Sequence, residues 1–206
     1  MILAKTFQKM SNCLREDTPS AFQLAGMHCD DADFAAARDL YLSAFPREER
    51  RDVCDWERLA TERSDTFSIR GIYDCRGQRP FWAGFLSIWR FDRFSYVEHF
   101  ATAPNLRGGG IGTTTLRLLQ QAEEDRPIVL EVEPPTTETA RRRIAFYERN
   151  GFSLCERAYV QPPYRPWEET EGLTLLLMTT APDFLEEHFD EVRATIYAEV
   201  YGVTGD

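Results

Sequence analysis

Seven residues, Arg107-Gly108-Gly109-Gly110-Ile111-Gly112-Thr113, form the junction that decides the expected fold. The segment before them, 96–102, is rich in β-branched and aromatic residues and predicts a strand, whereas 113–123 contains strong helix formers and predicts a helix. Glycine lets the backbone approach an anion, because a Cβ would hold a phosphate away, and a helix start adds unpaired N–H groups. The junction therefore predicts a main-chain site for a ligand that carries phosphates.

The same glycine run is, taken alone, also compatible with a plain flexible turn. A Walker loop is excluded, because the only lysines, Lys5 and Lys9, lie far upstream. The strict dinucleotide-binding spacing fails, because Thr113 stands where the third glycine would be. The pattern that fits is Arg-x-x-Gly-x-Gly.

Hydrophobic periodicity and turn residues predict the order of the other elements. Strands are expected over 22–28, 66–73, 81–91, 96–102, 128–133, 152–160 and 173–180. Helices are expected over 30–45, 48–63, 113–123, 137–150 and 182–200. The first twenty residues predict an accessory helix or a loose tail.

Two segments of the chain resemble the GNAT superfamily of acyltransferases. The first is YVEHFATAPNLR at 96–107 followed by GGGIG at 108–112, and the second is FYERNGF at 146–152. The resemblance implies an α/β (α+β) fold in which helices flank a mixed, mostly antiparallel central sheet, with two central strands splayed at the coenzyme A site. The resemblance says nothing about the first twenty residues, and the expected arrangement is an N-terminal extension over 1–20, an acetyltransferase domain over 21–181 and a C-terminal helix over 182–206 packed on that domain.

The resemblance further implies where acetyl-CoA binds as a co-substrate. The backbone of Phe100, Ala101 and Thr102 is expected to pair with the pantetheine arm. The pyrophosphate is expected at the glycine run, on Arg107, Gly108, Gly109, Gly110, Ile111, Gly112 and Thr113. No metal is expected.

Acetylation requires a neutral amine, and a lysine-like pKa of about 10.4 makes that form rare at pH 7. Glu98 is the candidate general base, because strand alternation predicts one shared face for residues 96, 98, 100 and 102. An ion pair between Glu98 and an arginine is the other interpretation, and Glu133 is the next candidate base. His99 is expected on the opposite face, packed in the core.

Tyr147 occupies the position of the family's tyrosine, and the resemblance implies that it protonates the departing thiolate, whose pKa resembles the cysteine value of about 8.5. A buried residue of an amphipathic helix is the other interpretation. The asparagine that the family commonly has seven residues earlier is replaced by Ala140. The aromatic loop 159–167 predicts either a wall of the acceptor cleft or a rigid surface turn or dimer contact.

Composition limits the classes of partner and location. The net charge of −10 argues against a nucleic-acid surface and weakly favours a cationic substrate, although an acidic surface that keeps the protein soluble is the better explanation of this charge. The five dispersed cysteines predict neither a disulfide framework nor a zinc site. No long apolar run predicts a membrane span, so a cytoplasmic protein is expected.

These observations together predict an N-acetyltransferase of the GNAT type. It is expected to move an acetyl group to a primary amine of a small molecule, an amino acid or a peptide, by direct attack in a ternary complex. The alternative is a non-catalytic module that binds acyl-CoA for regulation or interaction. The C-terminal helix is expected to dock on the domain or to form a homodimer contact.

Overall fold

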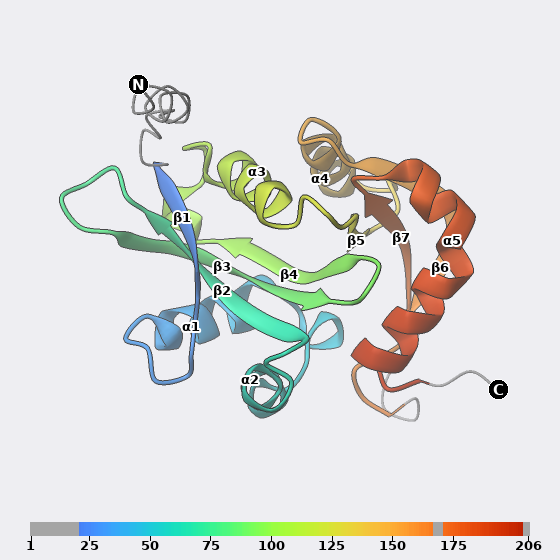
Figure 1. The fold of residues 1–206 in the computed structure, drawn as a ribbon, viewed down its shortest axis with the longest axis horizontal. Helices are drawn as coiled ribbons and strands as arrows, with labels where there is room; N and C mark the ends of the chain where they lie inside the picture. Colours follow the sequence, from blue (N-terminus) through green and yellow to red (C-terminus); the bar gives the residue numbers. More distant parts are fainter. Residues whose placement is uncertain (1–20, 167–170, 204–206) are drawn as a thin grey trace, which may run out of the picture.

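One seven-stranded sheet organises the chain, in the order β1-β2-β3-β4-β5-β7-β6 (Figure 1). The computed structural model describes residues 21–166 and 171–203, so the first twenty residues and Trp167 lie outside the described part. The strands are β1 Phe22–Gly26, β2 Phe67–Asp74, β3 Phe81–Arg90, β4 Ser95–Thr102, β5 Ile128–Val132, β6 Ser153–Gln161 and β7 Leu173–Thr179.

The two central strands part from each other after a short parallel stretch. β4 pairs with β5 only from Ser95 to Val97, opposite Ile128 to Leu130, while β4 continues to pair with β3 as far as Thr102. The other neighbouring strands are antiparallel. The predicted sheet, mostly antiparallel with splayed central strands, is confirmed.

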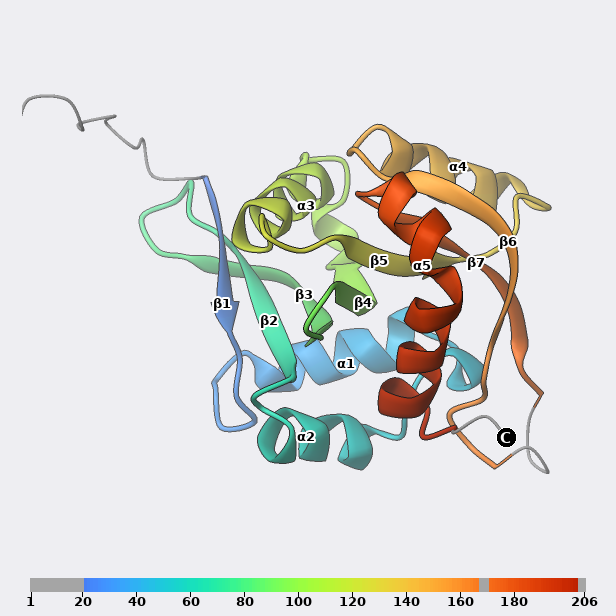
Figure 2. The same cartoon turned by 45° about the vertical axis from the view of Figure 1, so that its right-hand side comes forward.

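Helices cover both faces of the sheet (Figures 1 and 2). The helices α1 Phe34–Ala44 and α2 Val53–Glu62 lie on one face, and α3 Ile111–Ala122 and α4 Glu138–Glu148 lie on the other. The last helix, α5 Pro182–Thr195, continues into a π-helical turn, η3 Ile196–Val200, and crosses the sheet near β6 and β7. None of the helices in the described part of the chain is long and apolar enough to cross a membrane.

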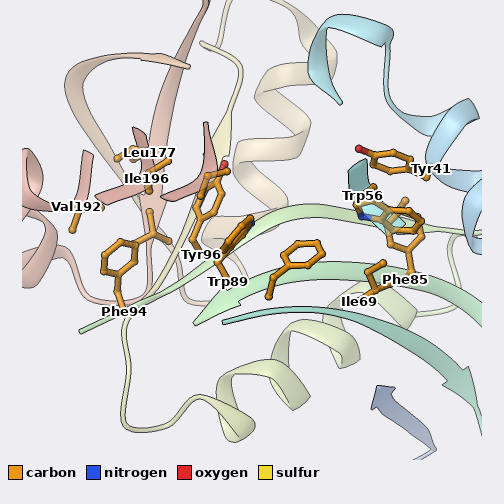
Figure 3. Close-up of a cluster of buried hydrophobic side chains, with 14 of the residues drawn as sticks. Tyr41, Trp56, Ile69, Phe85, Trp89, Phe94, Tyr96, Leu177, Val192 and Ile196 are labelled. Atoms are coloured by element: carbon orange, nitrogen blue, oxygen red, sulfur yellow. The ribbon is translucent and has the colours of Figure 1, made fainter. Parts of the chain in front are cut away.

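A large aromatic cluster fills the space between the sheet and α1, α2 and α5 (Figure 3). The rings of Tyr41 and Trp56 stack with centroids 4.4 Å apart, and Phe85 of β3 meets Trp56 edge-on. Leu185, Phe189 and Val192 of α5 belong to the same buried cluster. The C-terminal helix is thus packed into the same core as the central strands.

The helix predicted over 48–63 begins later in the structure. A short 3₁₀ turn, η1 Arg47–Glu49, is followed by extended backbone, and α2 starts only after Asp52. The Arg51 N–H donates to the Tyr41 hydroxyl at 2.8 Å, and its side chain points inward to Glu98. The buried partners of Arg51 hold this segment out of the helix, which periodicity alone cannot reveal.

Candidate active site

A β-bulge in β4 changes the expected arrangement of its side chains. Val97 pairs with Ile88 and His99 pairs with Ser87, so Glu98 is an extra residue in this strand. Tyr96 lies in the cluster beneath α1, α2 and α5, whereas Phe100 packs on the opposite side, with the clusters beneath α3 and α4. The prediction that residues 96, 98, 100 and 102 share one face is wrong, because the bulge interrupts the alternation.

Glu98 is held in a buried ion pair. Its Oε1 accepts from Arg51 Nε at 2.8 Å and its Oε2 accepts from Trp89 Nε1 at 2.7 Å, and its side chain is fully buried. Burial would raise the pKa of Glu98, but the Arg51 guanidinium, helped by the Trp89 hydrogen bond, holds it below its usual range. Of the two interpretations of Glu98, the ion pair with an arginine is the one that its contacts favour.

His99 is a neutral histidine of the core. Its Nε2 lies 3.1 Å from the Glu49 carbonyl and therefore carries the proton, which leaves Nδ1 to accept from the Ser87 hydroxyl. The ring also packs edge-on against Tyr41 and Phe45. Burial lowers the pKa of His99, with Glu98 opposing. Both nitrogens are thus engaged, and the predicted core role agrees with these contacts.

The glycine run forms a backbone cradle at the start of α3. Gly108 and Gly110 have φ angles of +87° and +75°, a conformation that side-chain-bearing residues rarely adopt, and a Cβ on either would face open space. Gly110 is the N-cap of α3, so the first turn leaves the N–H groups of Ile111, Gly112 and Thr113 without helix-internal acceptors. These exposed donors and the helix dipole fit a pyrophosphate.

The rest of the predicted coenzyme site lies along the departing end of β4. Phe100, Ala101 and Thr102 line the same cleft as the cradle. Because β5 has turned away, alternate residues of this segment direct N–H and C=O groups towards the gap. Such unpaired groups suit the amide-bearing arm of coenzyme A.

At Gly112, a Cβ would lie 3.0 Å from Phe146 Cζ, so glycine also permits α3 to approach α4.

A single cleft of about 620 Å³ joins the cradle to the interior of the sheet. All predicted site residues line it except Gly109. Tyr147 of α4 lies on its wall, with its ring packed edge-on against Phe146 and Phe152. Burial raises the pKa of Tyr147 to about 12, opposed by Arg143, so its hydroxyl is protonated at neutral pH.

The inner end of the cleft contains Glu131, which was not predicted. Its Oε1 accepts from the Tyr159 and Tyr201 hydroxyls, and Oε2 accepts from Tyr201 at 3.1 Å. Burial raises the pKa of Glu131 to about 7, and the hydrogen bonds from Tyr159, Tyr96 and Tyr201 limit that rise. The sequence signal was an acid inside the apolar strand IVLEV, where an unpaired charge is costly.

The end of β6 and the loop after it contribute a wall of the cleft. Gln161, the last residue of β6, and Tyr164 of the loop line the cleft, and the Arg51 guanidinium lies 4.9 Å from the centre of the Tyr164 ring. Arg165 fastens this loop to the segment before α2, through the Arg47 and Arg50 carbonyls and Asp52. The described part of the aromatic loop therefore lies at the cleft. This position favours the interpretation of the loop as a cleft wall.

Two further acidic side chains belong to the wall of the cleft. Glu49 and Glu133 line the cleft, and Glu133 pairs with Arg143 at 2.8 Å. Burial and the nearby Glu133 raise the pKa of Glu49, opposed by Arg143. Within the described residues, no group of three or more histidine, cysteine or acidic side chains is arranged to hold a metal ion.

A splayed antiparallel sheet with a glycine cradle at a helix start defines the class of acyl-CoA-dependent acyltransferases. A family model described as "Acetyltransferase (GNAT) domain" matches residues 73–154. A Bacteroides thetaiotaomicron protein assigned to the GNAT acetyltransferases is 39% identical, with a TM-score of 0.79 over 88% of this chain and 99% of that chain. The chain therefore belongs to the GNAT family and is an N-acetyltransferase.

More distant structures share the fold. A spermidine N-acetyltransferase from Vibrio cholerae, in complex with CoA and spermine, is 15% identical, with a TM-score of 0.57 over 78% of this chain and 95% of that one. Arabidopsis thaliana Naa50, in complex with the bisubstrate analogue CoA-Ac-MVNAL, is 16% identical, with a TM-score of 0.54 over 78% of this chain and 99% of that one. No curated protein matches the sequence.

Proposed function

We propose that this protein transfers the acetyl group of acetyl-CoA directly to a primary amine of a small molecule, an amino acid or a peptide. The observation that carries the proposal is the continuous cleft from the backbone cradle, past Tyr147, to the acidic inner end. One ligand can thus lie along β4 while a second enters from the acidic side. The ligands of the two distant relatives, spermine and a peptide-bearing analogue, are consistent with an amine acceptor.

The cradle residues hold the diphosphate through main-chain N–H groups, and residues 100–102 pair with the pantetheine arm. Bound in this way, the thioester supplies the acetyl group and a thiolate leaving group. An N–H near Phe100, on the side that β5 has left, can donate to the carbonyl oxygen as negative charge develops on it. The acidic mouth, with Glu49 and Glu133, favours a cationic acceptor over a neutral or anionic one.

Tyr147 is the proposed proton donor to the leaving sulfur. Its pKa of about 12 is above that of a thiol, about 8.5, so complete transfer to a free thiolate is uphill. A hydrogen bond from the hydroxyl nevertheless stabilises the sulfur as the C–S bond breaks. The proton lost from the nitrogen during collapse then replaces the one that Tyr147 gives up.

The function is tested by incubating the protein with acetyl-CoA and a panel of primary amines while free thiol is followed. Turnover with at least one amine is expected, and Tyr147→Phe is expected to reduce kcat by about 10- to 1,000-fold. Calorimetry should show unchanged coenzyme A binding by this variant, because the cradle is intact.

Binding of coenzyme A without turnover of any amine would instead support the non-catalytic acyl-CoA module. No binding of coenzyme A at millimolar concentration would contradict both functions. Normal turnover by Tyr147→Phe would remove Tyr147 from the mechanism and leave the transferase activity standing. The cytoplasmic location stays a prediction.

A further inference from the structure

We propose that Glu131, and not Glu98, is the general base that takes the proton from the acceptor ammonium group, directly or through one water molecule. This inference rests on the proposed function. It follows from the position of Glu131 at the splay, from its hydrogen bonds and from the lack of a cation beside it.

Glu131 lies at the point where the two central strands separate. Leu130 is the last residue of β5 that pairs with β4, and Glu131 is the next. It lines the cleft together with Phe100 and Tyr147, which lie on the proposed coenzyme side. An acceptor nitrogen that reaches the thioester between β4 and β5 therefore passes this carboxylate.

The hydrogen bonds to Glu131 hold it in place and leave one acceptor position available. Oε1 accepts from Tyr159, the Tyr201 hydroxyl lies within reach of both oxygens, and Tyr96 is a third donor to the carboxylate. Tyr201 is fixed in turn by Tyr96, whose hydroxyl lies 3.2 Å from its own. An ionised carboxylate accepts about four hydrogen bonds and three tyrosines donate to this one, so Glu131 can accept one more, from an ammonium group or a water molecule.

No described arginine or lysine forms an ion pair with Glu131 or with Glu49, whereas the two other acids of the cleft, Glu98 and Glu133, are paired. Arg51 neutralises Glu98, and Arg143 neutralises Glu133. The titratable and charged groups that face or surround Glu131 are Tyr96 and Glu98 on β4, Tyr159 on β6, Tyr164 in the following loop, Tyr197 on η3 and Tyr201 after it. The Arg51 guanidinium, which belongs to the same network of side chains, forms its ion pair with Glu98.

These surroundings give Glu131 the proton affinity that a base needs. Its pKa of about 7 allows the carboxylate to exist at neutral pH and still bind a proton strongly. The pKa of Glu98 is instead held below the usual range by Arg51, and both of its oxygens have partners. Both nitrogens of His99 are also occupied.

The proton balance of the reaction is complete with these residues. The ammonium group gives one proton to Glu131, and the neutral nitrogen forms the C–N bond. When the C–S bond breaks, the sulfur receives a proton from Tyr147, and the nitrogen loses a second proton, which restores Tyr147. Glu131 then releases its proton to water, so each turnover yields amide, thiol and one free proton.

The test compares pH profiles of kcat/KM for the wild type, Glu131→Gln and the control Glu156→Gln, which alters an exposed acid of β6 outside the cleft. The wild-type profile should rise with a midpoint near pH 7. Glu131→Gln should lower kcat/KM by about 100-fold or more at pH 7.5 and should abolish the rise of the profile near pH 7, which is its acid limb. Coenzyme A binding should be retained. Retention of the limb and of turnover within about threefold would overturn the proposal.

A second variant decides the matter if Glu131→Gln does not fold. Tyr201→Phe removes a donor that stabilises the carboxylate, so the midpoint of the acid limb should rise by about one pH unit. An unchanged midpoint would overturn the base assignment, because a purely structural tyrosine would alter rate or affinity without moving the limb.

Carbon-13 titration of the glutamate carboxyls in the ligand-free protein gives a readout independent of turnover. The resonance that disappears in Glu131→Gln is the one that belongs to Glu131. A midpoint near 7 for this resonance supports the proposal, and a midpoint below 5 overturns it. Failure of the proposed function is distinguishable, because the wild type itself would then acetylate no amine.

Discussion

Arg51 reaches from the segment before α2 to a carboxylate of the central strand. Its guanidinium donates to Glu98 and to the Val200 carbonyl, and it also lies over the Tyr164 ring. One side chain thus links the start of α2, the bulge in β4, the end of η3 and the wall of the cleft. The Glu98 contact is buried, so removal of only one partner leaves an uncompensated charge.

We predict that Arg51→Ala lowers the free energy of unfolding by about 3–5 kcal/mol. In the double variant with Glu98→Gln, the loss should be smaller than the sum of the two single losses, because the buried charge is gone. Urea denaturation of all four proteins measures this coupling. Arg58→Ala, which removes an exposed helical ion pair with Glu62, is the control and should cost less than about 0.5 kcal/mol. Additive losses would contradict a coupled buried pair.

Individual side-chain roles were only partly predictable from the sequence. The positions of the cradle glycines were predictable, because a positive φ or a close approach of another element requires glycine whatever the distant context. The assignment of Glu98 as a base assumed regular alternation, which the bulge breaks. The environment of Glu131 depends on Tyr159 and Tyr201, which are 28 and 70 residues away in the chain, and no local pattern encodes that meeting.

At the scale of elements, α5 is an integral layer of the fold. Phe189 is 1% exposed, and its ring is covered by the Arg157 guanidinium at 4.1 Å. The helix leads directly into η3 and Tyr201. Its packing against the sheet therefore also positions the Tyr201 hydroxyl, which donates a hydrogen bond to Glu131. Periodicity predicted a helix here, but not whether it would dock or form a dimer contact.

Phe189→Ala is expected to lower the free energy of unfolding by about 3–5 kcal/mol, because it leaves a cavity in the core. Chemical denaturation measures the loss. Phe81→Ala is the matched control, since Phe81 of β3 is 57% exposed, and it should change stability by less than about 0.5 kcal/mol. Equal effects of the two substitutions would show that α5 is not packed as described.

Strand and helix order was predictable because hydrophobic periodicity and turn residues are local signals. The delayed start of α2 was not, since Arg51 leaves the helical path for partners on β4 and η3. The splay between β4 and β5 came only from the family resemblance, because a sequence does not state where two strands stop pairing.

For the whole molecule, a carboxyl with a raised pKa makes stability depend on pH. Glu131 would titrate near 4.5 when unfolded and near 7 when folded, so between these values the folded state binds a proton that the unfolded state has released. The free energy of unfolding therefore falls as pH rises through this window. The contribution of Glu131 to this fall is on the order of 3 kcal/mol.

We predict that Glu131→Gln removes this contribution. The free energy of unfolding of the variant minus that of the wild type should therefore be larger at pH 8 than at pH 5. Urea unfolding at both pH values provides the comparison, and the difference between the two proteins cancels effects of other groups. Identical pH dependence in the two proteins would show that Glu131 has an ordinary pKa.

The domain arrangement stays a proposal at this scale: an extension over 1–20, an acetyltransferase domain over 21–181 and the segment 182–206 packed on it. The shared aromatic cluster supports the last two parts behaving as one unit. The acidic net charge of −10 fits the acidic mouth of the cleft but does not by itself identify an acceptor.

The bulge in β4 has a practical consequence for protein engineers. Deleting Glu98 would restore a regular strand in which Val97 and His99 keep their partners on β3, but the carboxylate that accepts from Arg51 and Trp89 would be lost. Anyone who transplants this pocket to another scaffold must therefore copy the irregular backbone along with the chosen side chains, since point substitutions on a straight strand could not reproduce it.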